Sequence, residues 1–134
     1  MRFIDANIFL RFLTIDDPVR GAKCFELMKR LERSEEEAFT SDVILAEVIY
    51  VLTRSRYQLG RSEVAPRMQA IIDLRGLKLA NKRVVQKALR LYNDQNLDFE
   101  DCLAVAQMEA EEITEIYSFA RGLDRVAGIS RVEP

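Results

Sequence analysis

Short apolar runs alternate with longer helical stretches along this chain, and the alternation restricts the folds that it can adopt. We predict strands over residues 2–5, 37–41, 77–80, 113–119 and 129–133. Apolar residues at helical spacing fill the intervals, which predicts helices over residues 6–13, 17–34, 42–55, 62–74, 81–94 and 97–112. Alternating strands and helices build βαβ units, which give parallel sheets covered by helices on both faces. The pattern therefore predicts an α/β protein, with residues 1–134 forming a single three-layer α/β/α domain around a short-stranded central parallel sheet.

The helix predicted over residues 17–34 has the clearest local signals. Asp17 precedes Pro18, and these residue types favour the N-cap and the first helical position. Its apolar stripe, which we expect to face the core, consists of Val19, Ala22, Phe25, Leu27, Met28 and Leu31. The composition of the chain supports a globular protein, since 49% of its residues are hydrophobic and 31% are charged.

Residue types that the chain lacks exclude several kinds of chemistry. The sequence contains no histidine, so Ser-His and Cys-His triads and imidazole zinc sites are excluded. The two cysteines, Cys24 and Cys102, are 78 positions apart and fit no metal-binding spacing, which indicates buried thiols in a reducing cytosol. The apolar amino terminus is interrupted by charged residues, so we expect neither a signal peptide nor a membrane span and predict a cytoplasmic protein.

The overall charge gives no support to nucleic-acid binding, because the net charge is −2. Three local groups of basic residues remain as candidate phosphate contacts, and each is also compatible with ordinary solvated surface. They are Arg54, Arg56 and Arg61; Lys82, Arg83, Lys87 and Arg90; and Arg121, Arg125 and Arg131.

A single carboxylate, Glu47, interrupts the apolar segment DVILAEVIYVL of residues 42–52. In a helix its neighbours at three and four positions are Val43, Ile44, Tyr50 and Val51, none of which can pair with a negative charge. An unpaired buried carboxylate costs several kcal/mol. Glu47 is therefore expected to face either a buried basic partner or a bound cation.

Other polar residues are expected at the same edge of the sheet as Glu47. Asp5 and Ser118 come at the ends of two predicted strands, and Asp98 and Asp101 open the helix that precedes the second of them. The carboxyl ends of parallel strands share one edge, where ligands bind. Capping is an alternative for Asp98 and Asp101, and a turn for Asp5. Several carboxylates in one pocket repel each other without a cation, and an oxygen-only site favours Mg²⁺ or Mn²⁺.

Four motifs resemble those of PIN-domain ribonucleases of the VapC toxin type. They are FIDANIFLRFL, SDVILAEVIYVL, LDFEDCLAVAQ and IYSFARGLDRVAG, in the family's order and spacing along essentially the whole chain. The resemblance places the family's acids at Asp5, Glu47 and Asp101. It gives Asn7 as a polar partner of the first acid and Asp98 as a frequent auxiliary of the third.

The resemblance implies a metal-dependent endoribonuclease that cleaves single-stranded RNA and acts as a toxin neutralised by an antitoxin. Asp5, Glu47 and Asp101 would hold one or two Mg²⁺ or Mn²⁺ ions, and Asn7 and Ser118 would orient ligands and phosphate. The implied partners are RNA and a cognate antitoxin protein. We also expect a homodimer, with the helices at 42–55 and 62–74 as candidate partner surfaces.

Position 120 departs from the family pattern. The family usually has an acid after the fourth strand, in a pattern like SFDRGFDRV, and this chain has Ala120 there. Asp124 matches a different acid of that pattern. The departure predicts a weakened second metal site and reduced turnover, whether Ala120 is natural or a deliberate replacement. The alternative is a non-catalytic PIN-fold protein that binds RNA or a partner. A phosphatase with Asp5 as nucleophile is a weaker rival, because such enzymes have an acid where this chain has Asn7.

Overall fold

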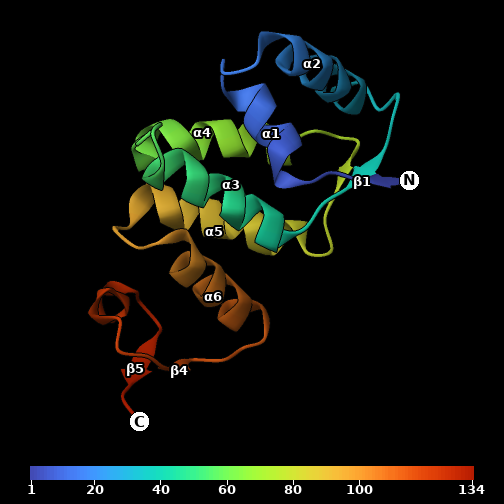
Figure 1. Cartoon of the computed structure of the whole chain (residues 1–134). Coiled ribbons are helices and arrows are strands. Elements are labelled where there is room, and N and C mark those ends of the chain that lie inside the picture. Colours follow the sequence, from blue (N-terminus) through green and yellow to red (C-terminus); the bar gives the residue numbers. More distant parts are fainter. The chain divides into compact units, whose positions relative to one another are not determined.

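The computed structural model describes all residues from 1 to 134, and they divide into two compact units (Figure 1). Unit 1 is Met1–Lys82 and unit 2 is Arg83–Pro134. Unit 1 contains β1 (Arg2–Phe3), α1 (Ala6–Leu13), α2 (Pro18–Glu32), β2 (Ala38–Phe39), α3 (Asp42–Arg54), α4 (Arg61–Ile72) and β3 (Leu77–Lys78). Unit 2 contains α5 (Lys82–Asp94, beginning at the boundary), α6 (Phe99–Ala110), β4 (Glu115–Tyr117), the 3₁₀ helix η1 (Arg121–Arg125) and β5 (Ser130–Val132).

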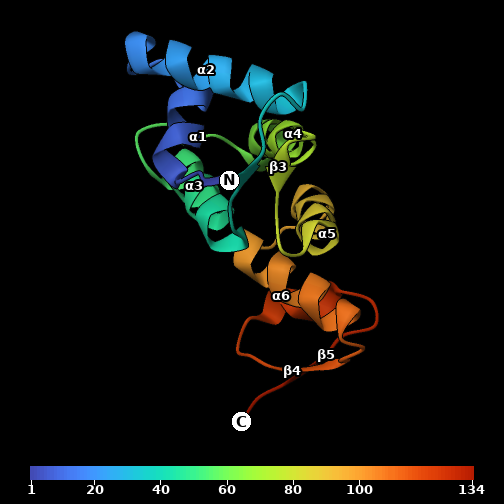
Figure 2. The same ribbon diagram turned by 90° about the vertical axis from the view of Figure 1, so that its right-hand side faces the viewer.

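The sheet of unit 1 has the order β1-β2-β3, and both strand pairs are parallel, as predicted. The strands are shorter than expected: each has two residues that pair, with Arg2 opposite Ala38 and Phe3 opposite Phe39. Helix α1 lies between α2 and α3 in both views (Figures 1 and 2), and it contacts both of them. The core of this unit includes Phe9, Leu31, Leu45, Leu52 and Met68, each fully buried.

Unit 2 has a separate two-stranded sheet in which β4 and β5 are parallel, again as predicted. The segment between these strands contains the short helix η1. Its Leu123 side chain is fully buried. Aromatic packing joins α5 to the start of α6, since the rings of Tyr92 and Phe99 meet edge to face with centroids 6.1 Å apart.

Helix α2 begins as predicted, and part of its predicted apolar stripe faces inward. The Asp17 carboxylate accepts a hydrogen bond from the Arg20 amide at 3.0 Å, with Pro18 at the first helical position. The buried residues of this helix are Cys24, Met28 and Leu31. Met28 and Leu31 are buried as predicted, but the prediction is wrong for Val19 and Phe25, which are 71% and 51% exposed. The helix has apolar residues on two faces, and the spacing alone does not identify the buried one.

The structure also describes the two cysteines and the length and apolar character of the helices. Cys24 and Cys102 are buried free thiols, as predicted. None of the helices combines the length and the apolar character needed to cross a membrane.

Candidate functional site

A buried hydroxyl holds the segment of unit 1 that leads into Asp5. The Ile4 amide donates to the Phe39 carbonyl at 2.8 Å, and the Thr40 hydroxyl donates to the Ile4 carbonyl at 2.9 Å. Thr40 is the one buried polar residue of the chain. Its amide also donates to the Lys78 carbonyl at 3.1 Å, so Thr40 connects the ends of all three strands. The sequence analysis missed this residue, although a polar side chain directly after an apolar strand was a usable signal.

Asp5 follows this anchored segment and is the N-cap of α1. Its carboxylate accepts a hydrogen bond from the Ile8 amide at 3.3 Å, which uses one of its two oxygens. Asp5 and Asn7 are both exposed. The local structural role considered for Asp5 is therefore real, and the exposed carboxylate also keeps the capacity to bind a ligand from solvent.

Glu47 is exposed, so the expectation of a buried carboxylate is wrong. Helix α3 buries Leu45, Val48, Ile49 and Leu52, which follow helical spacing. Glu47 lies outside that buried set. The apolar run is long enough to fill the buried face and still leave apolar side chains on the exposed face, which explains the wrong inference.

Asp5 and Glu47 lie on two helices that contact each other. Asp5 caps α1, Glu47 lies in the second turn of α3, and α1 packs against α3. The start of α3 is fixed by Ser41, whose hydroxyl accepts a hydrogen bond from the Ile44 amide at 3.3 Å. Unit 1 thus carries two exposed carboxylates on a well-anchored pair of helices.

Unit 2 carries its predicted acids in the first turn of α6. Asp98 is the N-cap and Asp101 follows three positions later, yet the Asp98 side chain makes no capping hydrogen bond. Burial raises the pKa of the half-buried Asp101 carboxyl, and the nearby charges of Asp98 and Glu100 raise it further. Asp98, Glu100 and Asp101 thus lie within one helical turn, and a nearby cation would relieve the repulsion between their charges.

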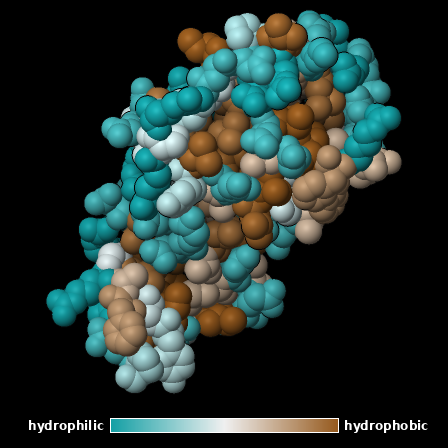
Figure 3. Space-filling view, viewed as in Figure 1, coloured by the Kyte–Doolittle hydropathy of each residue, from teal (hydrophilic) through white to brown (hydrophobic).

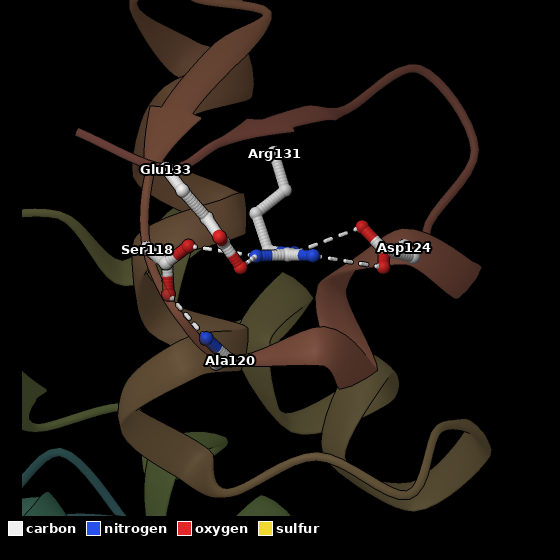
Figure 4. A network of polar contacts seen from close by, with 5 residues as sticks. All are labelled: Ser118, Ala120, Asp124, Arg131 and Glu133. Carbon is white, nitrogen blue, oxygen red and sulfur yellow. Dashed lines mark hydrogen bonds and ion pairs between the residues drawn. The ribbon is translucent and has the colours of Figure 1, made fainter.

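Ser118 and Ala120 lie beside a cluster of ion pairs around Arg131 (Figure 4). The Arg131 side chain is only 12% exposed. Its guanidinium donates to the Asp124 carboxylate at 3.0 and 3.3 Å, to Glu133 at 2.8 Å and to the Ser118 carbonyl at 3.0 Å. We call these four residues the Arg131 clamp. The clamp joins the end of β4 to η1 and β5.

The Ser118 hydroxyl has a local role in the turn that follows β4. It accepts a hydrogen bond from the Ala120 amide at 3.0 Å. Ala120 is the N-cap of η1, and its carbonyl accepts from the Leu123 amide at 3.1 Å. An aspartate at this position would be placed at a helix start, where its carboxylate could accept from the backbone.

Asp124 does not replace the acid that position 120 lacks. Both of its oxygens bind Arg131, and this hydrogen bonding lowers the pKa of the Asp124 carboxyl. The same contacts raise the pKa of Arg131. Several other candidate phosphate contacts are also engaged: Arg56 with Asp16 and Tyr57, Lys87 with Glu109, Arg125 with the Asn96 carbonyl, and Lys82 with the Leu74 and Leu77 carbonyls. The predicted basic groups are therefore partly structural.

The donor chemistry of the predicted residues fits a hard divalent cation, because all three acids offer carboxylate oxygens. Two of them lie in unit 1 and one lies in unit 2. The structure gathers no group of three cysteine, aspartate or glutamate side chains that could hold a metal ion.

Comparisons with known proteins identify the family. The sequence model of the PIN domain family matches residues 2–129. A relative named VapC ribonuclease, from Aquifex aeolicus, is 22% identical over 134 residues, which are 100% of this chain and 97% of the relative. The crystal structure of VapC20 from Mycobacterium tuberculosis, described as a sarcin–ricin loop cleaving toxin, shares 21% identity and a TM-score of 0.39, with both chains covered completely. The chain therefore belongs to the PIN domain family, as its motifs predicted, and it is similar to members of the VapC type.

Proposed function

We propose that this protein is a metal-dependent endoribonuclease that cleaves single-stranded RNA and acts as a toxin neutralised by an antitoxin. The observation that carries the proposal is the family match along nearly the whole chain, with acids at all three positions that the motifs identify. The name of the relative from Aquifex aeolicus supports ribonuclease chemistry. We further propose that the two units act together as one PIN-like domain over residues 1–134.

Asp5, Glu47 and Asp101 are the proposed ligands of a shared Mg²⁺ or Mn²⁺ site, of one or two ions. Such a cation lowers the pKa of a bound water and stabilises charge on the phosphate. Asp5 is suited to this role because α1 and the Thr40 hydroxyl fix its backbone. Asp101 is suited because burial and, to a lesser extent, the charges of Asp98 and Glu100 raise its pKa, and a nearby cation would favour its charged form. Asn7, Asp98 and Ser118 are proposed to orient ligands and phosphate.

Ala120 reduces this activity under our proposal. The position lies at the start of η1, beside the Ser118 turn, and it offers no carboxylate. Asp124 is held by Arg131 and does not compensate. We therefore expect slow turnover and a weakened second ion in this chain.

The decisive experiment is cleavage of pooled single-stranded RNA in Mn²⁺ and in EDTA, with this chain beside its Ala120→Asp variant. We expect cleavage only with metal, at a rate at least tenfold higher for Ala120→Asp. Glu47→Gln and Asp5→Asn should reduce cleavage by 100-fold or more. Glu26→Gln, an exposed carboxylate on α2 paired only with Lys29, is the matched control and should keep full activity.

The alternative is a PIN-fold protein that binds RNA or a partner without cutting, and the missing acid at position 120 favours it. RNA binding without cleavage by either this chain or Ala120→Asp would establish that alternative. The proposed protein partners are an antitoxin and a second copy of the chain, and the proposed location is the cytoplasm. Ile15 and Val19, at 92% and 71% exposure, offer apolar contact area for a protein partner. Helix α4 offers less apolar contact area than predicted, because its large apolar side chains are buried.

A further inference from the structure

Unit 1 carries three aromatic rings that each pack against a basic side chain. Lys29 lies 5.3 Å from the centroid of Phe25, Arg54 lies 5.4 Å from Tyr50, and Arg56 lies 5.3 Å from Tyr57. Two of these rings have additional partners. Phe25 also stacks against Phe12, with centroids 6.1 Å apart, and the Tyr57 hydroxyl contacts Asp16. The pair of Tyr50 and Arg54 differs from them in its position on α3.

Tyr50 lies on the same helix face as Glu47. Val43, Glu47, Tyr50 and Arg54 are spaced by four, three and four residues, which places them along one stripe of α3. Tyr50 is 56% exposed and Val43 is 71% exposed. At about 1.5 Å of rise per residue, Tyr50 stands roughly 4.5 Å along the helix axis from Glu47. One nucleotide can span that distance.

The composition of this stripe suits a nucleotide base better than another protein. Two of its four side chains are charged, so only Val43 and Tyr50 supply large apolar contact area. The centre of a protein interface is depleted in charge and needs more apolar area than these two residues provide. An aromatic ring beside a guanidinium plane is the usual platform for an unpaired RNA base. On the face drawn in Figure 3, hydrophobic patches lie among hydrophilic residues.

We propose that Tyr50, with Arg54 packed against its ring, stacks a base of the single-stranded RNA next to the phosphodiester that is cut. This inference rests on the proposed function, because Glu47 gives the stripe its link to the reacting phosphate. Stacking reads the face of a base and not its edge, so Tyr50 contributes affinity with little sequence preference. Its role is to bind and align the substrate.

Substitution of Tyr50 tests the proposal directly. Tyr50→Ala should raise the Kd for a fluorescein-labelled single-stranded RNA, measured by anisotropy in EDTA, by about 5- to 100-fold. In Mn²⁺, with the Ala120→Asp variant as background, the same change should raise KM similarly and alter kcat by less than about threefold. Tyr50→Phe keeps the ring, and its Kd should stay within twofold of the parent. Phe25→Ala removes a ring of similar exposure that also has a basic neighbour, and it should leave Kd unchanged.

Several results would overturn the proposal. A Kd for Tyr50→Ala within twofold of the parent would remove the stacking role. Equal losses for Tyr50→Ala and Phe25→Ala would indicate a general effect on unit 1. Unchanged RNA binding together with a changed mass in sedimentation would assign the stripe to contacts between copies of the chain. These failures are separate from failure of the proposed function, which is the absence of metal-dependent cleavage by both the parent and Ala120→Asp; binding in EDTA still tests Tyr50 in that case.

Discussion

In unit 1 the residue before Asp5 is held by a buried neutral hydroxyl, whereas in unit 2 the end of β4 is held by the charged Arg131 clamp. Thr40 is fully buried and makes one hydrogen bond to the Ile4 carbonyl. Arg131 reaches two carboxylates and one carbonyl, and those carboxylates are about half exposed. A buried neutral bond responds little to salt or pH, while an ion cluster near solvent responds to both. The two segments should therefore differ in how salt and pH affect their stability.

Replacing one glycine in each unit gives the largest expected effect. A Cβ at Gly76 would lie 2.2 Å from the Glu36 carbonyl oxygen and 3.0 Å from the Leu31 carbonyl oxygen. Because both are backbone atoms in a packed turn, we expect Gly76→Ala to lower the free energy of unfolding by about 3 kcal/mol or more. A Cβ at Gly122 would lie 2.7 Å from Leu97 Cδ2, the end of a side chain that can rotate. Gly122→Ala should cost about 1 kcal/mol.

Urea denaturation, combined with amide hydrogen exchange to assign the loss to a unit, measures both variants. Equal losses would mean that Leu97 is held as rigidly as the backbone around Gly76. The expectation that the Leu97 side chain can rotate away from a Cβ at position 122 would then be wrong.

Thr40→Val tests the buried bond of unit 1. The change keeps the shape of the side chain and removes the donor to the Ile4 carbonyl, so it should cost about 1–3 kcal/mol. The loss should be the same in 50 mM and in 1 M salt. Thr53→Val is the matched control: its hydroxyl bonds back to the Ile49 carbonyl within α3, and its loss should stay within about 0.5 kcal/mol. A strong salt dependence for Thr40→Val would contradict the neutral character of this anchor.

Arg131→Gln tests the Arg131 clamp of unit 2 and should lower stability less than Thr40→Val does. It should speed hydrogen exchange at the amides of Ser118 and Ala120 and lower the Tm at pH 7 in 50 mM salt. The difference from the parent should shrink in 1 M salt. Arg90→Gln removes an exposed charge on α5 and is the control.

The same variant makes a prediction for pH. Hydrogen bonding to Arg131 lowers the folded pKa of Asp124 below its ordinary value of 3.8. The stabilisation is therefore fully present above that ordinary value and is lost as the pH falls through the lowered pKa. The Tm difference between the parent and Arg131→Gln should persist at pH 5 and decline below about pH 4. A Tm difference that stays constant down to pH 2 would show that the ion pair of Arg131 and Asp124 does not cause it.

The sequence predicted local and periodic features well. The cap at Asp17 follows from a rule that acts over a few residues, and the α/β class and the parallel pairing follow from the alternation of strands and helices along the chain. The family motifs also identified the correct family. The exposure of Glu47 was not predictable from the same pattern, because the apolar run of α3 contains more apolar residues than its buried face needs.

Contacts between residues far apart in the chain were the least predictable part of the site. Thr40 binds the carbonyl of a residue 36 positions away, and Arg131 binds a carbonyl 13 positions away. Periodicity carries no information on such pairs. The sequence analysis therefore took Arg131 as a possible phosphate contact, and only its position between Asp124 and Glu133 shows that it is structural. Asp5, Glu47 and Asp101 remain predicted ligands.

The smallest expected effect comes from a feature that both units share. Helices α2 and α6 end with the same pair of backbone hydrogen bonds. After α2, the Ser34 amide donates to the Leu31 carbonyl and the Glu35 amide donates to the Arg30 carbonyl. After α6, the Glu112 amide donates to the Glu109 carbonyl and the Ile113 amide donates to the Met108 carbonyl. Ser34 and Glu112 have φ angles of 58° and 57°, in the left-handed region where glycine is favoured.

Ser34→Gly and Glu112→Gly should therefore each raise the free energy of unfolding by about 0.5–1 kcal/mol, while alanine at either position should give no gain. Urea denaturation of the four variants provides the measurement. Since the backbone strain is the same at both ends, a gain for Ser34→Gly without one for Glu112→Gly would mean that the Glu112 side chain itself stabilises unit 2. Glu112 lines a cavity of about 480 Å³ between α5, α6 and residues 126–129, so that result would assign the missing gain to contacts in this cavity.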